Sequence, residues 1–271
     1  MKLCVLADNN VYIGPYLRGE PGFSCYIEDG DTRLLLDTGF SPLFLENARA
    51  LGVDLGRLDA AALSHGHNDH TCGLPALMEL PRPREAGPLT LVGHPRLFEP
   101  RKIRERDAGC PVTREQAAQT FDLRLSRQPV RLSEHITWLG EIPRVTPFEA
   151  REPLGMRLAQ GGWEEDFLPD DTGLVYEDDD GLFLIVGCAH CGVCNLAEAA
   201  RKLCGNKPVK GILGGFHLRR LDERAEQTAE YLEGLGLEML YPCHCTCFDV
   251  KARLARSIPV TEVGVGLTLK R

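Results

Sequence analysis

Short apolar runs joined by tight turns open the chain. Residues 3–7 and residues 23–27 are apolar and have the length of buried strands. Asp29-Gly30 is a favourable hairpin turn, and it leads into a third apolar run over residues 32–37. The pattern therefore predicts a start built of strands and tight turns, in place of the βαβ unit that begins a Rossmann fold.

Helical spacing first appears after this third run. Ser41 is predicted to cap a helix over residues 43–51, whose apolar residues fall on one face and which ends at Gly52. A strand over residues 58–63 follows. In the next segment, residues 71–80, apolar residues recur three and four positions apart, which predicts a second helix.

Strands alternate with helices in much of the remaining chain. Strands are predicted over residues 89–93, 182–186, 209–213 and 237–241, two short strands over 130–139, and helices over 195–204 and 222–235. Two β-rich halves, each with helices outside, predict an α/β fold of the αββα sandwich type, formed as a single domain over residues 1–271.

Two polar segments interrupt this pattern. Residues 100–128 are rich in Arg and Glu and contain Cys110-Pro111, which indicates a possible lid or insertion; a plain solvated excursion is the alternative. Residues 163–171 are acidic and are predicted to form a loop.

Composition narrows the class of protein. A net charge of −8 argues against a nucleic-acid partner, because binding to phosphate backbones depends on clustered Lys and Arg. The first apolar run is too short for a signal peptide, and no stretch has the length of a membrane span. The count of 11 cysteines is odd, which favours reduced thiols in a cytoplasmic protein over a disulfide framework. Composition leaves the oligomeric state open.

Metal-binding residue types are concentrated between the strand at 58–63 and the helix that follows. His65, His67, Asp69 and His70 lie within six residues on this loop. Imidazole nitrogens and a carboxylate oxygen suit zinc, iron or manganese. The alternative is a polar loop whose histidines merely cap the helix.

Three further histidines follow strands in the second half of the chain. His190, His217 and His244 come after the runs that end at residues 186, 213 and 241. Each one taken alone would be an ordinary loop residue. Sheets that present their loops along one edge gather such residues, so together they predict a single site.

The H-x-H-x-D-H spacing resembles the signature of the metallo-β-lactamase superfamily. The resemblance implies that His65 and His67 bind one metal and that Asp69 and His70 bind a second. An aspartate at the place of Asp37 buttresses the metal loop in that superfamily, so Asp37 is expected to support the site without binding metal.

Five motifs in the same order resemble one subfamily of this superfamily, labelled dihydropteroate-synthase-like or 7,8-dihydropterin-6-methyl-4-(ribofuranosyl)aminobenzene 5′-phosphate synthase. The motifs are Ser64-His-Gly-His-Asn-Asp-His, Gly140-Glu-Ile-Pro-Arg, Gly187-Cys-Ala-His, Gly214-Gly-Phe-His-Leu and Pro242-Cys-His-Cys-Thr. They span nearly the whole chain, so the resemblance implies the metallo-β-lactamase fold throughout. It says less about the reaction, because this scaffold hosts many activities.

The resemblance also implies roles for the later residues. His244 is expected at the second metal, together with Cys188, which stands where most members carry a bridging aspartate. His190 is the candidate to complete the first metal site, with His94 as its rival. His217 is expected to touch substrate.

The expected activity is hydrolysis of a small anionic metabolite, a phosphoester or a pterin-like compound. Two metals would share a water and lower its pKa to about 7, giving hydroxide at neutral pH. Asp69 would orient the hydroxide, while Arg144 and His94 are candidates for binding substrate. The ligand set allows zinc, manganese or iron, and Cys188 favours zinc.

Two other functions remain open at this point: an iron-dependent oxidoreductase or thiol redox sensor on the same fold, and a binding protein that holds an anion through a metal. Cys188, Cys191 and Cys194 form a C-x2-C-x2-C spacing that occurs in iron–sulfur sites and, in part, in zinc sites. Small-for-small replacement is the favoured alternative, because a helix starting near Asn195 would turn Cys191 and Cys194 away from the metals. The sequence leaves open any role of Cys245 and Cys247.

Overall fold

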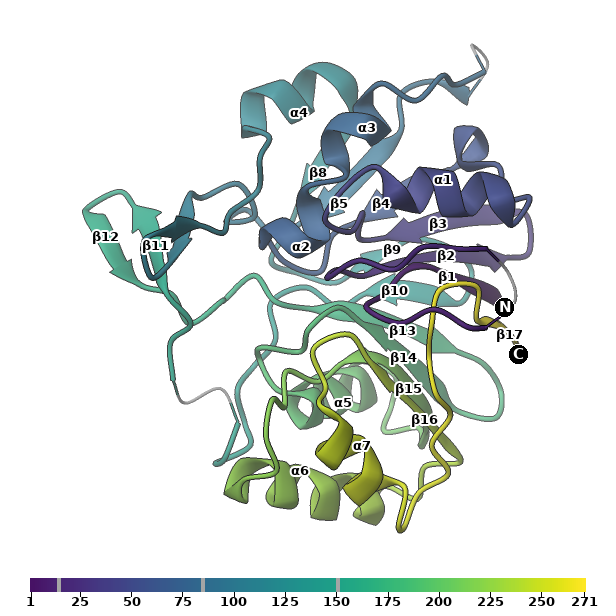
Figure 1. Cartoon of the computed structure of the whole chain (residues 1–271), viewed down its shortest axis with the longest axis vertical. Coiled ribbons are helices and arrows are strands. Elements are labelled where there is room, and N and C mark those ends of the chain that lie inside the picture. Colours follow the sequence, from purple (N-terminus) through teal and green to yellow (C-terminus); the bar gives the residue numbers. More distant parts are fainter. Residues whose placement is uncertain (14–15, 84–85, 150–151) are drawn as a thin grey trace.

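Two β-sheets lie face to face, with helices on the outer side of each (Figure 1). This arrangement comes from a computed structural model, which describes residues 1–13, 16–83, 86–149 and 152–271. The predicted αββα sandwich is confirmed. No helix in these ranges combines the length and the hydropathy needed to cross a lipid bilayer.

The first sheet has seven strands in the order β17-β1-β2-β3-β4-β5-β8. They are β1 (Lys2–Ala7), β2 (Ser24–Asp29), β3 (Thr32–Leu36), β4 (Ala60–Ala62), β5 (Thr90–Gly93), β8 (Asp122–Leu125) and β17 (Thr268–Lys270). Strands β17, β1, β2 and β3 pair antiparallel, whereas β3, β4, β5 and β8 run parallel.

The second sheet has six strands in the order β16-β15-β14-β13-β10-β9. They are β9 (Val130–Arg131), β10 (Ile136–Trp138), β13 (Gly173–Glu177), β14 (Leu182–Val186), β15 (Val209–Gly215) and β16 (Met239–Cys243). Strands β14, β15 and β16 are parallel, so the loops that follow them leave the same edge of the sheet.

Residues 100–128, expected to form one lid or insertion, divide between two parts of the molecule. Strands β6 (Arg101–Ile103) and β7 (Arg106–Asp107) pair with β11 (Met156–Ala159) and β12 (Gly162–Glu165) in a small third sheet that projects from the sandwich (Figure 1). Helix α4 (Arg114–Thr120) and strand β8 belong to the main body.

The remaining helices cover the outer faces. They are α1 (Leu43–Ala50), α2 (Asn68–Thr71) and α3 (Leu74–Met78) over the first sheet, and α5 (Val193–Leu203), α6 (Glu223–Gly234) and α7 (Phe248–Leu254) over the second (Figure 1). A short 3-10 turn, Leu55–Arg57, precedes β4. The helix expected over residues 71–80 is present but shorter, as α3 at Leu74–Met78. A separate one-turn helix, α2, precedes it and begins at Asn68, among the metal-loop residues.

Several elements were missed in the sequence. Strands β11, β13 and β17 and helix α7 had no prediction, and β12 overlaps the segment expected to be loop. Helix α7 carries Asp249, Lys251 and Arg253 and leaves the side chain of Phe248 80% exposed, so its apolar stripe is too thin to show in the sequence.

The main core lies between the sheets. In β3, Leu34 and Leu36 point into this layer, while Leu35 packs toward the helices. The indole of Trp138 is fully buried there, and its Nε1 donates a hydrogen bond to the carbonyl of Leu63 (3.2 Å). This hydrogen bond links the two sheets directly beside the metal loop. Truncating a buried aromatic side chain of this kind lowers the free energy of unfolding by about 3–5 kcal/mol.

Candidate metal centre

Loops from both sheets meet at one edge of the sandwich. The first sheet contributes the residues after β3 and β4, and the second sheet contributes those after β14, β15 and β16. Within each sheet these strands are parallel neighbours, so their carboxyl ends deliver side chains to a common place. The histidines that follow separate strands in the sequence are therefore neighbours in space.

Three histidines form the first group that could hold a metal: His65, His67 and His190. Nε2 of His65 lies 3.1 Å from Nδ1 of His67, and the ring of His190 is centred 4.8 Å from that of His65. Burial lowers the pKa of all three, that of His67 to about 3. The imidazoles are therefore neutral, which is the form that binds metals.

A second group places Asp69, His70, Cys188 and His244 together. Nε2 of His70 lies 3.1 Å from Sγ of Cys188, and Nε2 of His244 lies 3.3 Å from a carboxylate oxygen of Asp69. Burial opposes ionisation of Asp69, yet the charges of His70 and His244 hold the pKa of its carboxyl below the usual range. Burial raises the pKa of the Cys188 thiol. This thiol is therefore protonated when no metal is bound.

Unsatisfied nitrogens show that both groups fit metal ions. Nε2 of His67 and Nε2 of His190 are buried and have no hydrogen-bond partner in the part of the chain that the structure describes, and Nε2 of His244 has only its ion-pair contact with Asp69. A buried polar atom left unpaired costs about 1–3 kcal/mol. Nitrogen, carboxylate and thiolate donors suit zinc and related divalent metals, so a metal would satisfy these atoms.

Asp37 supports the metal loop through hydrogen bonds. Its Oδ1 accepts a hydrogen bond from the backbone N–H of Ser64, and its Oδ2 accepts one from the Ser64 hydroxyl, each at 2.7 Å. Oδ2 also lies 2.7 Å from Nδ1 of His70, so it fixes the orientation of that ring. Gly187 packs so closely here that a Cβ would approach the Ser64 hydroxyl to 2.2 Å.

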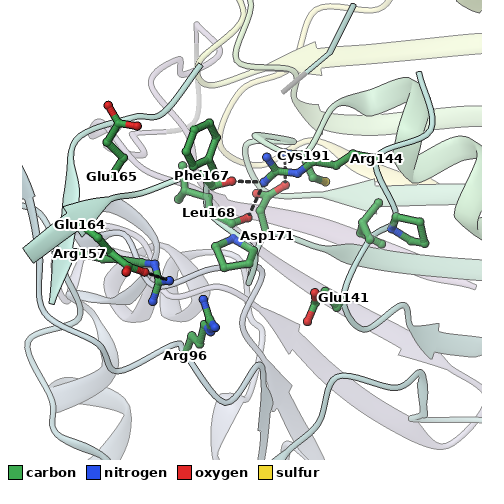
Figure 2. A pocket seen from close by; sticks show the side chains of 13 residues that line it. Arg96, Glu141, Arg144, Arg157, Glu164, Glu165, Phe167, Leu168, Asp171 and Cys191 are labelled. Atoms are coloured by element: carbon green, nitrogen blue, oxygen red, sulfur yellow. Dashed lines mark hydrogen bonds and ion pairs between the residues drawn. The ribbon is translucent and has the colours of Figure 1, made fainter. Parts of the chain in front are cut away.

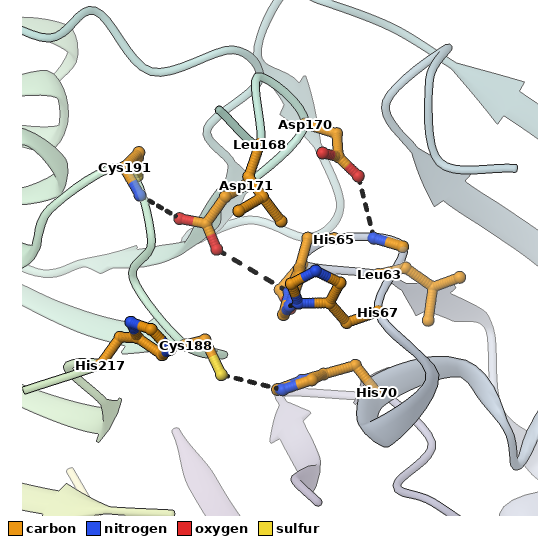
Figure 3. Close-up of polar contacts among 12 residues, drawn as sticks. Leu63, His65, His67, His70, Leu168, Asp170, Asp171, Cys188, Cys191 and His217 are labelled. Atoms are coloured by element: carbon orange, nitrogen blue, oxygen red, sulfur yellow. Dashed lines mark hydrogen bonds and ion pairs between the residues drawn. The ribbon is translucent and has the colours of Figure 1, made fainter. Parts of the chain in front are cut away.

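A second support, which sequence reasoning missed, comes from the acidic segment before β13. Asp170 accepts a hydrogen bond from the backbone N–H of Gly66 (2.9 Å) and forms an ion pair with Arg101 (2.7 Å). Asp171 lies 3.8 Å from Nδ1 of His65 and accepts from the backbone N–H of Cys191 (2.9 Å), as Figure 3 shows. The carboxylates of Asp170 and Asp171 are buried, so the end of this predicted loop packs directly against the site.

A cavity of about 560 Å³ opens over both groups. His217 lines it, with its ring centred 4.3 Å from that of His190 and its Nε2 unpaired among the described residues. Burial lowers the pKa of His217 to about 3, so this imidazole is neutral. Arg219, two residues further on, also lines the cavity and was not singled out in the sequence.

A sequence profile of the metallo-β-lactamase superfamily matches residues 17–244. The chain belongs to the metallo-β-lactamase superfamily.

Relatives in this superfamily agree with the match. A 7,8-dihydropterin-6-methyl-4-(β-D-ribofuranosyl)-aminobenzene-5′-phosphate synthase of Methanocaldococcus jannaschii is 30% identical over 93% of this chain and 89% of its own. The crystal structure of a metal-dependent hydrolase of the β-lactamase superfamily is 26% identical, with a TM-score of 0.84 over 100% of this chain and 99% of that one. Zn²⁺-bound PqqB from Methylobacterium extorquens shares the fold, with 15% identity and a TM-score of 0.56 over the full length of both chains.

Two residues expected to bind substrate lie away from the metallo-β-lactamase-type centre. Arg144 donates hydrogen bonds to the carbonyls of Phe167 and Leu168 and lines a different cavity, of about 700 Å³ (Figure 2). Nε2 of His94 lies 3.1 Å from Glu141, and its Nδ1 accepts from the backbone N–H of Arg96. His190, and not His94, is grouped with His65 and His67.

The cysteines also separate. Cys191, just before α5, and Cys194, within α5, are buried in the core and belong to neither candidate metal group of the described residues. Cys245 instead lies beside the second group, with its Sγ 3.4 Å from that of Cys188. Burial opposes ionisation of Cys245, but its hydrogen bond with Cys188 and the charge of His244 lower its pKa to about 6.

Proposed function

We propose that this chain is a dinuclear metal-dependent hydrolase that acts on a small anionic metabolite. The observation that supports this most is the adjacency of the two groups, joined by the rings of His65 and His70, whose centres lie 4.3 Å apart. Metals at such neighbouring positions are the arrangement used for hydrolysis of phosphoesters and related substrates.

The proposed ligands divide between the two groups. His65, His67 and His190 would hold one metal, and Asp69, His70, Cys188 and His244 the other. Bound there, the metals would supply Lewis acidity that polarises the substrate and acidifies water. Cys188 favours zinc, while the histidines and Asp69 also allow manganese or iron.

Side chains of the cavity wall would position the substrate. His217 presents an unpaired Nε2 to the cavity and is neutral, so it can hydrogen-bond a substrate oxygen or accept a proton there. Its place is fixed by Arg224, which donates to the His217 carbonyl (2.5 Å). Asp69, ionised beneath the same cavity, would orient water for attack as well as bind metal.

Arg219 replaces Arg144 as the proposed cation that attracts an anion. It lines the 560 Å³ cavity and an adjoining one of about 460 Å³ that also borders His190 and His217. Its guanidinium has no ion-pair or hydrogen-bond partner among the described residues, whereas Arg220 is paired with Asp222. An unpaired guanidinium suits a phosphate or carboxylate, and the relative from M. jannaschii carries a phosphate ester in its name.

Metal content and turnover test the proposal together. The purified chain should bind two zinc ions and hydrolyse members of a phosphoester and pterin metabolite panel, with loss of turnover on chelation and return on adding zinc. Turnover that survives complete chelation would contradict it. Metal binding without turnover would favour the anion-binding protein, and visible absorbance from iron would favour the oxidoreductase.

A further inference from the structure

The second metal group contains a thiol that touches another thiol. Sγ of Cys188 lies 3.4 Å from Sγ of Cys245 and 3.1 Å from Nε2 of His70. The same sulfur thus faces a partner thiol on one side and a metal-binding group on the other. We propose that Cys188 and Cys245 form an oxidisable pair, whose disulfide withdraws Cys188 from the second metal group.

The scaffold holds the two sulfurs close without joining them. Cys188 follows β14 and Cys245 follows β16, and β15 pairs with both strands. The backbone N–H of His217 donates to Sγ of Cys245 (3.2 Å), and a Cβ on Gly215 would approach this sulfur to 2.6 Å. A disulfide bond is about 2.05 Å long, so the two sulfurs, now 3.4 Å apart, have to approach each other by roughly 1.35 Å to form it.

Access gives the two thiols different roles. Both thiols line the 560 Å³ cavity, but Cys245 is partly exposed whereas only 2% of Cys188 is exposed. A small oxidant in the cavity therefore reaches Cys245 more readily, which leaves Cys188 as the resolving thiol. Cys247 lines the same cavity but has no thiol at hydrogen-bond distance in the described residues.

The reaction balances with hydrogen peroxide as the oxidant. The sulfur of Cys245 attacks one peroxide oxygen, the O–O bond breaks, and the sulfur becomes a sulfenic acid while the other oxygen leaves as water. The sulfur of Cys188 then attacks the sulfur of Cys245 and expels a second water. In total the two thiols lose two electrons and two protons, which reduce the peroxide to two waters.

The consequence for metal binding rests on the proposed function. A sulfur in a disulfide is no thiolate, so oxidation would leave only Asp69, His70 and His244 in the second group. A bound metal would in turn hold Cys188 as a metal thiolate and slow the reaction. Oxidation and occupation of the second group therefore compete for one sulfur atom.

Peptide mapping of the metal-free full chain tests the pair itself. The reduced protein is treated with one equivalent of hydrogen peroxide and digested without reductant. We expect a peptide cross-linked through Cys188 and Cys245, lighter by two hydrogens and separated again by dithiothreitol. Cys247→Ser should cross-link like the wild type, and Cys245→Ser should not. Overoxidation of Cys245 beside a free Cys188 thiol would overturn the proposal.

Zinc loading separates this inference from the proposed function. In protein that binds two zinc ions, cross-linking should slow several-fold, and the cross-linked form should retain one zinc fewer. Equal rates with and without zinc, or full zinc retention after cross-linking, would overturn the competition. A chain that cross-links but never binds zinc would contradict the proposed hydrolase while leaving the thiol pair established.

Discussion

The two halves of the metal centre are built in different ways. The first sheet supplies His65, His67, Asp69 and His70 from one continuous loop. The second sheet supplies Cys188, His190, His217 and His244 from three separate loops, after β14, β15 and β16. In the contiguous loop, the relative positions of the side chains are set by a short stretch of backbone. The relative positions of the dispersed residues depend on the register of three parallel strands.

Backbone conformation shows the same contrast. None of loop residues 63–67 has a positive φ, although Asp37, which supports this loop, has a φ of +58°. In the second half, Ala189, His217 and His244 have φ values of +51°, +46° and +49°, a region that is costly for non-glycine residues. Strain of this kind gathers at functional sites where the surrounding structure enforces it. We therefore expect the contiguous loop to lose metal binding when a supporting residue is removed. For the dispersed residues, we expect each substitution to affect only its own metal.

Removing Asp37 should have the largest effect. Asp37→Ala leaves Ser64 and His70 without their buried acceptor, and breaking a buried charged pair costs about 3–5 kcal/mol. We expect a drop of that size in the free energy of unfolding of the metal-free protein, together with loss of both metals. Urea denaturation and metal analysis would measure the two effects.

Asp29→Ala is the matched control. Asp29 is also buried and also accepts from a serine hydroxyl, Ser133 (2.6 Å), and from a histidine, His135, whose backbone N–H and Nδ1 both lie 3.0 Å away. It lies far from the site, and its partners are partly exposed, so about 1–2 kcal/mol should be lost with both metals retained. Equal retention of metal in the two variants would contradict the role given to Asp37.

Removal of one dispersed ligand should cost one metal. His244→Ala deletes a side chain that reaches the second group from its own loop, so the first group should keep its metal. We expect metal content to fall from two ions to one per chain, with a smaller loss of stability than in Asp37→Ala, because metal binding contributes to folding stability. Loss of both ions would show that the dispersed residues are not independent.

The contiguous half of the centre was open to prediction for a physical reason. Residues as close in sequence as His65 and His67 are necessarily close in space, so the spacing itself indicates that their side chains can share a metal. The supports from Arg101, Asp170 and Asp171 were hidden, because burial of a charge depends on partners far along the chain, such as Asp166 for Arg101 (2.8 Å).

The sequence also could not show in which direction a side chain points. Arg144 belongs to a motif of the subfamily, yet its side chain points to the carbonyls of Phe167 and Leu168 (Figure 2). Arg219 directly follows a recognised motif and was not singled out, and the role of Cys245, inside another motif, stayed open, because an arginine or cysteine near a histidine has no characteristic spacing. Only the packing of β14, β15 and β16 shows what these side chains face.

Arg219→Ala should act on substrate binding. Because this guanidinium is exposed at the cavity rim, its loss should weaken inhibition by inorganic phosphate roughly tenfold, about 1.4 kcal/mol, and raise KM for anionic substrates more than it lowers kcat. Arg144→Ala, in the other cavity, should leave phosphate inhibition unchanged. The reverse pattern would restore Arg144 as the anion-binding residue.

The smallest effect should come from relieving strain beside Cys188. Ala189→Gly removes a buried methyl group, worth about 0.8 kcal/mol, and adds about 0.4–1 kcal/mol of unfolded-state entropy. Glycine at positive φ also recovers roughly 1–2 kcal/mol, so the terms nearly cancel. We expect the stability of the metal-free protein to change by less than about 1 kcal/mol.

Ala197→Gly gives the comparison that makes this small number informative. Ala197 is equally buried in the same core but sits inside helix α5, where glycine loses the methyl group and about 1 kcal/mol of helix propensity with no strain to recover. It should therefore cost about 2 kcal/mol, as measured by urea denaturation. Equal losses of unfolding free energy in the two variants would mean that the positive φ at Ala189 stores no strain. That result would contradict the proposed difference in backbone strain between the contiguous and dispersed halves.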